Sequence, residues 1–150
     1  MEQSRARTRG TAEQHRPSAV VIRTAERRDA EGIRTIYNHY VTESTTLFDM
    51  VPRTLDEQVQ WIDEHSGGHP AVVAELDGHQ GRGVGRLLLE EVLRLASAHG
   101  FHSVIARITG DNQASIALHA ACGFEIVGTE REVGRKFGQW LDVVEMQRML

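Results

Sequence analysis

The 150-residue chain contains a single cysteine, Cys122, and this scarcity sets the first limits on its class. One cysteine excludes an internal disulfide and is typical of a reducing compartment, so we expect a cytoplasmic protein. Positively charged residues are also outnumbered, because 17 Lys and Arg against 21 Asp and Glu give a net charge of -4. That balance argues against a nucleic-acid partner. No apolar run is long enough to cross a membrane, so we expect no membrane partner.

The N-terminal segment lacks the apolar stretch of a secretory signal. It is rich in arginine, but Glu2 and Glu13 argue against a transit peptide. We therefore expect residues 1–18 to be a disordered leader and residues 19–150 to form a single domain. That length is sufficient to bury a hydrophobic core. A composition of 40% hydrophobic and 25% charged residues is typical of a soluble globular protein.

Apolar periodicity predicts a mixed α/β fold in which strands and helices alternate. Thr54 and Glu57 resemble a capping box at the start of one helix, and Gly100 is placed to end another. The residues GRKFGQ, 134–139, are expected to separate the last two strands. Predicted strands lie at 19–25, 71–76, 103–109, 124–133 and 140–149, and predicted helices lie at 26–41, 54–65, from the glycine-rich stretch to Gly100, and at 111–123.

The sequence GHQGRGVGRLL, residues 78–88, has glycines at alternate positions just before a helix. Gly81, Gly83 and Gly85 leave the backbone free of side chains where helix N–H groups lack intrahelical partners. Such groups bind phosphates when the backbone can approach closely. The stretch therefore predicts a phosphate-bearing ligand, the alternative being a flexible loop that only opens a helix.

Two common phosphate motifs do not fit this stretch. A P-loop requires a Gly-Lys-Ser/Thr sequence, and no lysine follows the glycines. A Rossmann fingerprint requires a third glycine at the position of Arg86. The pattern present is Gln80-x-x-Gly83-x-Gly85, which resembles the acetyl-CoA pyrophosphate loop of the GNAT N-acetyltransferases.

Several further segments support this resemblance. DNQASIALHAACGFE, residues 111–125, resembles the family segment in which Asn opens a helix and Gly-Phe closes it. IYNHYV, TLFDMVPRT and REVGRKFGQWLDVVEMQ are similar to the phosphinothricin/methionine-sulfoximine acetyltransferase branch. In patches, the resemblance covers nearly all of the chain from Ala19 to Leu150.

The resemblance implies a mixed sheet flanked by helices and an enzyme that moves an acetyl group from acetyl-CoA to the primary amine of a small amino-acid-like substrate. It implies direct attack by the amine. The histidines have no cysteine pair or carboxylate pattern beside them, so we expect no metal, and a homodimer is a candidate assembly. The residues that it assigns to coenzyme A are Gln80, Gly81, Arg82, Gly83, Val84, Gly85, Arg86, Asn112 and Ser115. His119 would protonate the departing thiolate.

Three of these assignments have plainer alternatives. Asn112 is equally compatible with a simple helix cap, Ser115 with an ordinary helix-interior residue, and His119 with a half-buried packing residue. The cations Arg53, Arg135 and Lys136 could meet a substrate carboxylate, but isolated charges of this kind are usually solvated, and we interpret them so.

One departure from the family is large. In the family, two more antiparallel strands lie between AVVAEL and the glycine loop, whereas here ELDG runs directly into HQGRGVG. The sheet is therefore expected to be shortened by an internal deletion, and no residue inherits the role of the family's acidic base. Residues 71–76 either move beside 103–109 or leave a gap with two exposed edges, and the sequence does not decide between these. The functional alternative is a coenzyme A binding module with weak or no catalysis.

Overall fold

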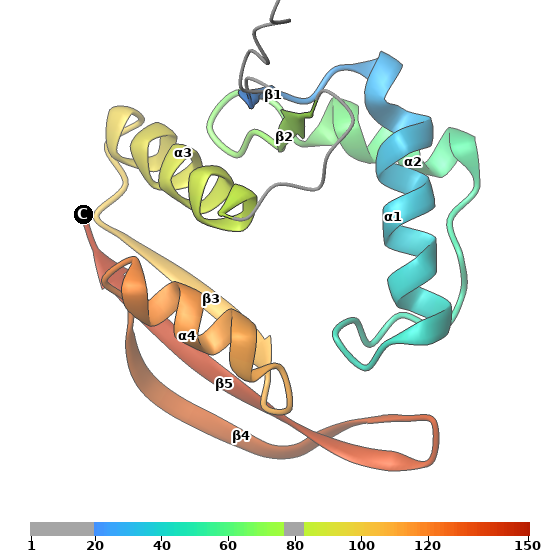
Figure 1. The fold of residues 1–150 in the computed structure, drawn as a ribbon, viewed down its shortest axis with the longest axis vertical. Helices are drawn as coiled ribbons and strands as arrows, with labels where there is room; N and C mark the ends of the chain where they lie inside the picture. Colours follow the sequence, from blue (N-terminus) through green and yellow to red (C-terminus); the bar gives the residue numbers. More distant parts are fainter. Residues whose placement is uncertain (1–19, 77–82) are drawn as a thin grey trace, which may run out of the picture.

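The computed structural model describes residues 20–76 and 83–150, and its strands form two separate sheets. The first sheet pairs β1 (Val21–Thr24) with β2 (Val72–Glu75) in antiparallel register, Val21 opposite Glu75. The second sheet has the order β3-β5-β4, with β3 (Ser103–Thr109) and β4 (Glu125–Lys136) both antiparallel to the central β5 (Gln139–Met149). Figure 1 shows the two sheets at opposite ends of the molecule.

Four helices and one short 3-10 turn connect and flank these strands. They are the turn Arg27–Asp29, α1 (Ala30–Glu43), α2 (Leu55–Glu64), α3 (Val84–Ala98) and α4 (Gln113–Ala121). In Figure 1, α1 and α2 lie beside the two-stranded sheet, while α4 lies along one face of the three-stranded sheet. The predicted mixed α/β architecture is confirmed, with every predicted helix and strand of the described residues present.

Helix ends follow the local sequence signals. Thr54 caps α2, because its hydroxyl accepts the Glu57 N–H at 3.3 Å while the Glu57 carboxylate accepts the Thr54 N–H at 2.7 Å. Gly100 has a φ of +80° just past α3, as a glycine cap requires, and the Phe101 N–H returns to the Ala96 carbonyl at 3.1 Å.

The last two strands are longer than predicted, so the loop assigned to residues 134–139 is wrong. β4 continues through Lys136 and β5 begins at Gln139. Only Phe137 and Gly138 form the turn, with φ values of +49° and +78°. Two successive positive φ values are typical of a type I′ hairpin, whose twist matches that of the strands it joins. A phenylalanine at the first position hid this turn from sequence reasoning.

The core lies between the three-stranded sheet and its helices. Leu93 of α3 and Ile108, Phe124 and Met146 of the sheet region are buried together with Cys122. A buried Cys122 agrees with packing and not with exposed thiol chemistry.

Of the two alternatives for residues 71–76, the structure takes the gap. In the described part of the chain, β2 pairs with β1 alone and β3 with β5 alone, so the proposed move of β2 to the side of β3 does not occur. A hollow of about 480 Å³ separates residues 68–70 from the start of β3 beneath α3. Pairing with β1 already satisfies one side of β2, and no strand in the described residues reaches its other side.

Candidate functional site

The N-terminus of α3 is open to a ligand from its glycine side. Gly83 is the N-cap, with a φ of +95°, and no side chain of the described residues caps the helix. A Cβ added to Gly83 would meet no atom of the described residues within 4 Å. The described residues therefore leave space beside the first-turn N–H groups, and the helix dipole makes this end electropositive. Gln80, Gly81 and Arg82, also assigned to the ligand, lie outside the described residues.

The glycine at position 85 is explained by helix packing and not by open space for a ligand. A Cβ added there would lie 3.3 Å from Cδ2 of Leu118 on α4, so the glycine allows α3 and α4 to approach closely. This contact brings the two helix N-termini to the same side of the molecule, as Figure 1 shows. The sequence assigned Gly85 to the ligand, and the structure adds a packing role.

A cavity of about 840 Å³ joins the start of α3 to α1 and to the edge of β2. Val84 of α3 and Asn112 of the α4 cap both line it, so two separate sequence predictions meet at one cavity. Its other lining residues are Arg28, Asp29, Gly32, Ile33, Ile36, Tyr37, Tyr40, Thr46, Leu47, Val72, Val73, Ala74, Glu75, Leu76 and Leu88. The wall is mainly apolar, with polar groups at its two ends, as in many small-molecule sites.

Arg86 lies elsewhere. It lines a second hollow of about 720 Å³ with Cys122 and Arg148, and its Nε donates to the Glu90 carboxylate at 2.7 Å. The structure thus does not bring Arg86 to the cavity that Val84 and Asn112 share.

Asn112, Ser115 and His119 form one chain of contacts along α4. The Asn112 side chain accepts the Ser115 N–H at 3.1 Å, so the predicted cap is present. His119 Nδ1 lies 2.8 Å from the Ser115 carbonyl, which requires that Nδ1 carry a proton. Nε2 of the neutral ring is then an acceptor, and the ring donates from Nε2 only as imidazolium. The ring is half-buried and edge-on to Phe124. Of the described residues lining the large cavity, none is Ser115 or His119.

Arg23 forms hydrogen bonds with two carboxylates that line the cavity, those of Asp29 and Glu75. It donates to both oxygens of Asp29 at 2.7 and 2.8 Å and, through Nε, to Glu75 at 2.9 Å. These hydrogen bonds, with a further one from the Glu26 N–H, lower the pKa of Asp29 to about 2 despite its partial burial. A carboxylate with so low a pKa is a poor general base.

Tyr37 contributes a protonated hydroxyl to the cavity wall. Burial raises its pKa, and the hydrogen bond that it donates to the Asp49 carboxylate raises the pKa further. Arg53 stacks over its ring, 3.8 Å from the centroid. This interaction explains why Arg53 is half-buried and not a fully solvated charge.

The described residues hold no group of three or more His, Cys, Asp and Glu side chains with metal-binding geometry. No helix of the described residues is long and apolar enough to cross a membrane.

Within residues 44–54, which connect α1 to α2, sequence reasoning named Arg53 but missed Thr46 and Leu47. Thr46 and Leu47 line the cavity, and the Thr45 hydroxyl donates to Asp111, next to the Asn112 cap. It also misjudged Lys136, which is 1% exposed and not solvated as expected. No local signal marks either feature, because each depends on contacts between distant parts of the chain.

Comparison with known proteins gives a consistent result. Residues 60–124 match the model of the acetyltransferase (GNAT) family. The chain is 33% identical to the L-methionine sulfoximine/L-methionine sulfone acetyltransferase of Pseudomonas paraeruginosa, over 84% of this chain and 92% of that protein. It is 32% identical to the phosphinothricin N-acetyltransferase of Streptomyces coelicolor, over 94% of this chain and 99% of that protein.

These alignments span 158 and 175 positions, which is more than the 150 residues of this chain. The relatives therefore contain residues that have no counterpart here. The expected internal deletion between AVVAEL and the glycine loop agrees with this difference.

Solved structures are also similar. The N-acetyltransferase of Staphylococcus aureus superposes with a TM-score of 0.83 at 28% identity, over 88% of this chain and 99% of that chain. A GNAT superfamily phosphinothricin acetyltransferase of Sinorhizobium meliloti, solved in complex with acetyl-CoA, gives 0.80 at 29% identity, over 87% and 88% of the two chains. The arrangement of helices and strands described above is therefore also found in these solved structures.

Proposed function

Because this chain belongs to the GNAT acetyltransferase family, we propose that it transfers an acetyl group from acetyl-CoA to the primary amine of a small amino-acid-like substrate. The family and the mixed fold expected from the motifs are confirmed. The substrate class is taken from relatives named for methionine sulfoximine, phosphinothricin and L-amino acids. Acetyl-CoA supplies an activated thioester, which the free amine would attack directly. A homodimer and the cytoplasm stay predictions from the sequence.

One observation carries the proposal: the predicted phosphate end and the predicted pantetheine contact share a cavity. Gly83 leaves open space beside the free N–H groups of α3, so the local backbone fits a pyrophosphate. Val84 and Asn112 then line a largely apolar space that continues along α1. A ligand with an anionic end and a long, mainly neutral arm fits this distribution of groups.

The residues of α4 would serve the thiol side of the reaction. The Ser115 carbonyl fixes the His119 ring through Nδ1, leaving Nε2 as the position that exchanges a proton. An imidazolium at Nε2 would donate to a leaving thiolate, whose usual pKa of about 8.5 demands only modest assistance. Asp29 of the cavity wall has a lowered pKa and is therefore a poor base.

The experiment that tests the ligand assignment is a thermal shift with coenzyme A. Bound ligand should raise the melting temperature of the parent, and Gly83→Asp should abolish that rise by adding a side chain and a negative charge beside the phosphates. Gly67→Asp is the matched control, because Gly67 also has a positive φ, +65°, and open space around it, but lies away from the cavity. Equal shifts in parent and Gly83→Asp would refute the assignment.

The second candidate function is a coenzyme A binding module with little turnover. The separation of β2 from β3 favours it, because no strand of the described residues stands where the family resemblance implies the strands that line the thioester. Release of free thiol from acetyl-CoA in the presence of a panel of amino acids separates the two functions. Coenzyme A binding without thiol release would select the module.

A further inference from the structure

Lys136 is the most unusual charged residue of the described chain. It is 1% exposed and, among the described residues, forms no ion pair with a carboxylate. A buried ammonium is costly unless its donors are satisfied. Its Nζ donates to the Leu47 carbonyl at 2.6 Å and to the Tyr40 carbonyl at 3.4 Å, and it lies 5.2 Å from the centre of the Phe137 ring. Two carbonyls and an aromatic face therefore replace water around it.

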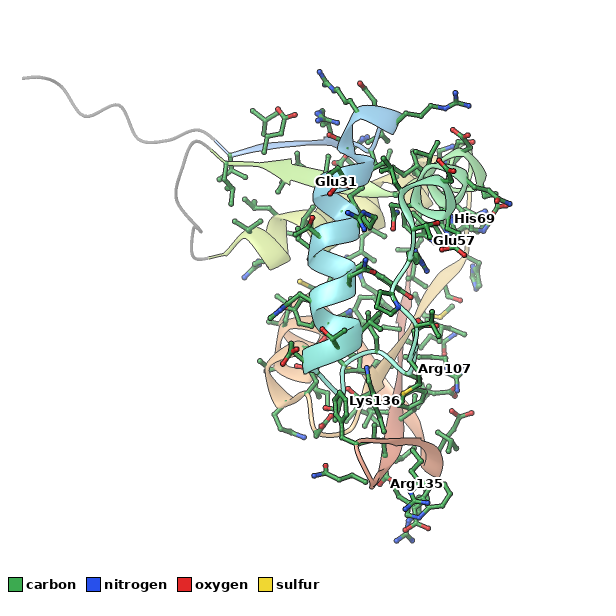
Figure 2. All side chains as sticks on the ribbon, turned by 90° about the vertical axis from the view of Figure 1, so that its right-hand side faces the viewer. Glu31, Glu57, His69, Arg107, Arg135 and Lys136 are labelled. Carbon is green, nitrogen blue, oxygen red and sulfur yellow. The ribbon has the colours of Figure 1, made fainter. Side chains whose placement is uncertain are left out.

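The position of this ammonium is explained by the end of α1. The carbonyls of the last helical turn carry partial negative charge, which a cation stabilises, and the Tyr40 carbonyl also accepts the Ser44 N–H at 3.2 Å. The last turn of α1 contains no basic residue of its own. Lys136 supplies the missing cation from β4, 96 residues further along the chain. Figure 2 shows Lys136 below the last turn of α1, whereas Arg135 lies farther from this helix.

A second contact holds residues 44–49 against the hairpin that β4 and β5 form. The ring of Phe48 lies against Gly134, so closely that a Cβ on this glycine would come within 2.7 Å of the ring. Residues 44–49 are thus held by Lys136 at Leu47 and by the flat surface of Gly134 at Phe48. The two anchors lie two residues apart on β4 and one residue apart on the held segment.

This held segment forms a wall of the cavity that contains Val84 and Asn112. Leu47 lines the cavity, while its own carbonyl receives the Lys136 ammonium. Thr46 lines it as well. The hairpin therefore sets the position of the wall that faces α3 across the cavity, without itself entering the cavity.

We propose that Lys136 is a positioning residue that holds residues 44–49 as a wall of this cavity, and so determines how tightly the cavity binds acetyl-CoA. The identity of this ligand rests on the proposed function, but the holding of the segment does not. The first measurement therefore requires no turnover.

Hydrogen–deuterium exchange of the full chain tests the anchor directly. Lys136→Met keeps the length and apolar stem of the side chain but removes the ammonium. Loss of hydrogen bonds from a charged donor should raise exchange at residues 44–49 by about tenfold or more, while exchange in α3 and α4 is unchanged. Arg135→Met is the matched control, because this neighbouring cation is exposed and lies 5.6 Å from the centre of the Trp140 ring. Unchanged exchange in folded Lys136→Met would overturn the proposal.

Gly134→Ala provides an independent variant if Lys136→Met does not fold, as judged by circular dichroism. The added methyl group must displace Phe48, so exchange should rise in the same residues. In the thiol-release assay, both variants should raise the acetyl-CoA KM roughly tenfold, with kcat per folded molecule within about twofold. An unchanged acetyl-CoA KM in the folded variants would refute the positioning role. No thiol release from the parent would refute the proposed acetyl transfer instead, and exchange alone would then decide the anchor.

Discussion

The two sheets have similar strand sequences but bury very different amounts of side chain. No residue of β1 or β2 is fully buried, although valine or isoleucine occupies two of the four positions in each strand. In contrast, Ile108, Leu141, Val143 and Met146 of the three-stranded sheet are all buried. The difference lies in their neighbours, because β5 has a strand on each side, while in the described chain β1 and β2 pair only with one another. A strand's burial is decided by what packs around it and not by its own composition.

The largest expected effect comes from completing the smaller sheet. Grafting the two absent strands of a close relative between Gly78 and His79 should raise the rate of acetyl transfer, because such strands offer an oxyanion donor worth about 10²–10³ in rate. A proton acceptor would add about 10²–10⁴. Thiol release with acetyl-CoA and methionine sulfoximine measures the gain. Fast turnover by the ungrafted chain would contradict this expectation. It would mean that β2 supplies the catalytic groups of the absent strands.

The two sheets should also respond differently to cavity-forming substitutions. Phe124→Ala, beneath the three-stranded sheet, should lower the free energy of unfolding by about 3–5 kcal/mol, because Phe124 is 3% exposed. Val73→Ala in β2 should cost only about 1 kcal/mol, because this side chain is half-buried and already lines a cavity. Urea denaturation measures both. Equal losses would mean that β1 and β2 pack more tightly in solution than this comparison implies.

A substitution of His119, on the helix that packs against the three-stranded sheet, tests whether this residue protonates the leaving thiolate. In the grafted chain, His119→Ala should lower kcat by about 10²-fold while coenzyme A affinity changes by less than twofold. If the ring only packs on Phe124, the variant should lose stability and keep its turnover per folded molecule. Isothermal titration with coenzyme A, together with thiol release, distinguishes the two results.

The smallest effect concerns acid stability near the smaller sheet. Arg23 holds the pKa of Asp29 at about 2, below the ordinary value of 3.8, so this pair stabilises the fold above pH 4 and its contribution is lost as pH falls toward 2. Arg23→Gln should therefore melt below the parent at pH 7, and the difference should close between pH 4 and pH 2. Arg34→Gln, which breaks an exposed helical pair with Glu31, should show little difference at either pH. A gap between parent and Arg23→Gln that persists at pH 2 would contradict this assignment.

Much of the fold was predictable because its signals are local. The capping box at Thr54, the cap at Asn112 and the glycine at Gly100 each fix a helix end through residues within a few positions. Two short motifs with the right spacing were likewise sufficient to predict the family. The meeting of Val84 and Asn112 at one cavity followed from the family resemblance, since no periodicity relates residues so far apart.

The remainder depended on contacts that sequence does not encode locally. Whether β2 moves toward β3 is a competition between pairings of similar strands, and only the assembled molecule resolves it. Nothing in the local sequence distinguishes Lys136 from an exposed hairpin lysine, because its burial depends on its contact with the end of α1. Arg86 looks like a phosphate ligand until its partner Glu90 and its separate hollow are known.

The central position of β5 has a consequence for how the chain is made. This strand follows every other described element in the sequence, yet β3 and β4 pair through it alone. During synthesis from the N-terminus, β3, α4 and β4 therefore emerge before the strand that joins them, with Ile108 and Phe124 still uncovered. The nascent chain should consequently depend on chaperones until its final residues leave the ribosome, and premature stops within β5 should yield insoluble protein and not a shortened enzyme.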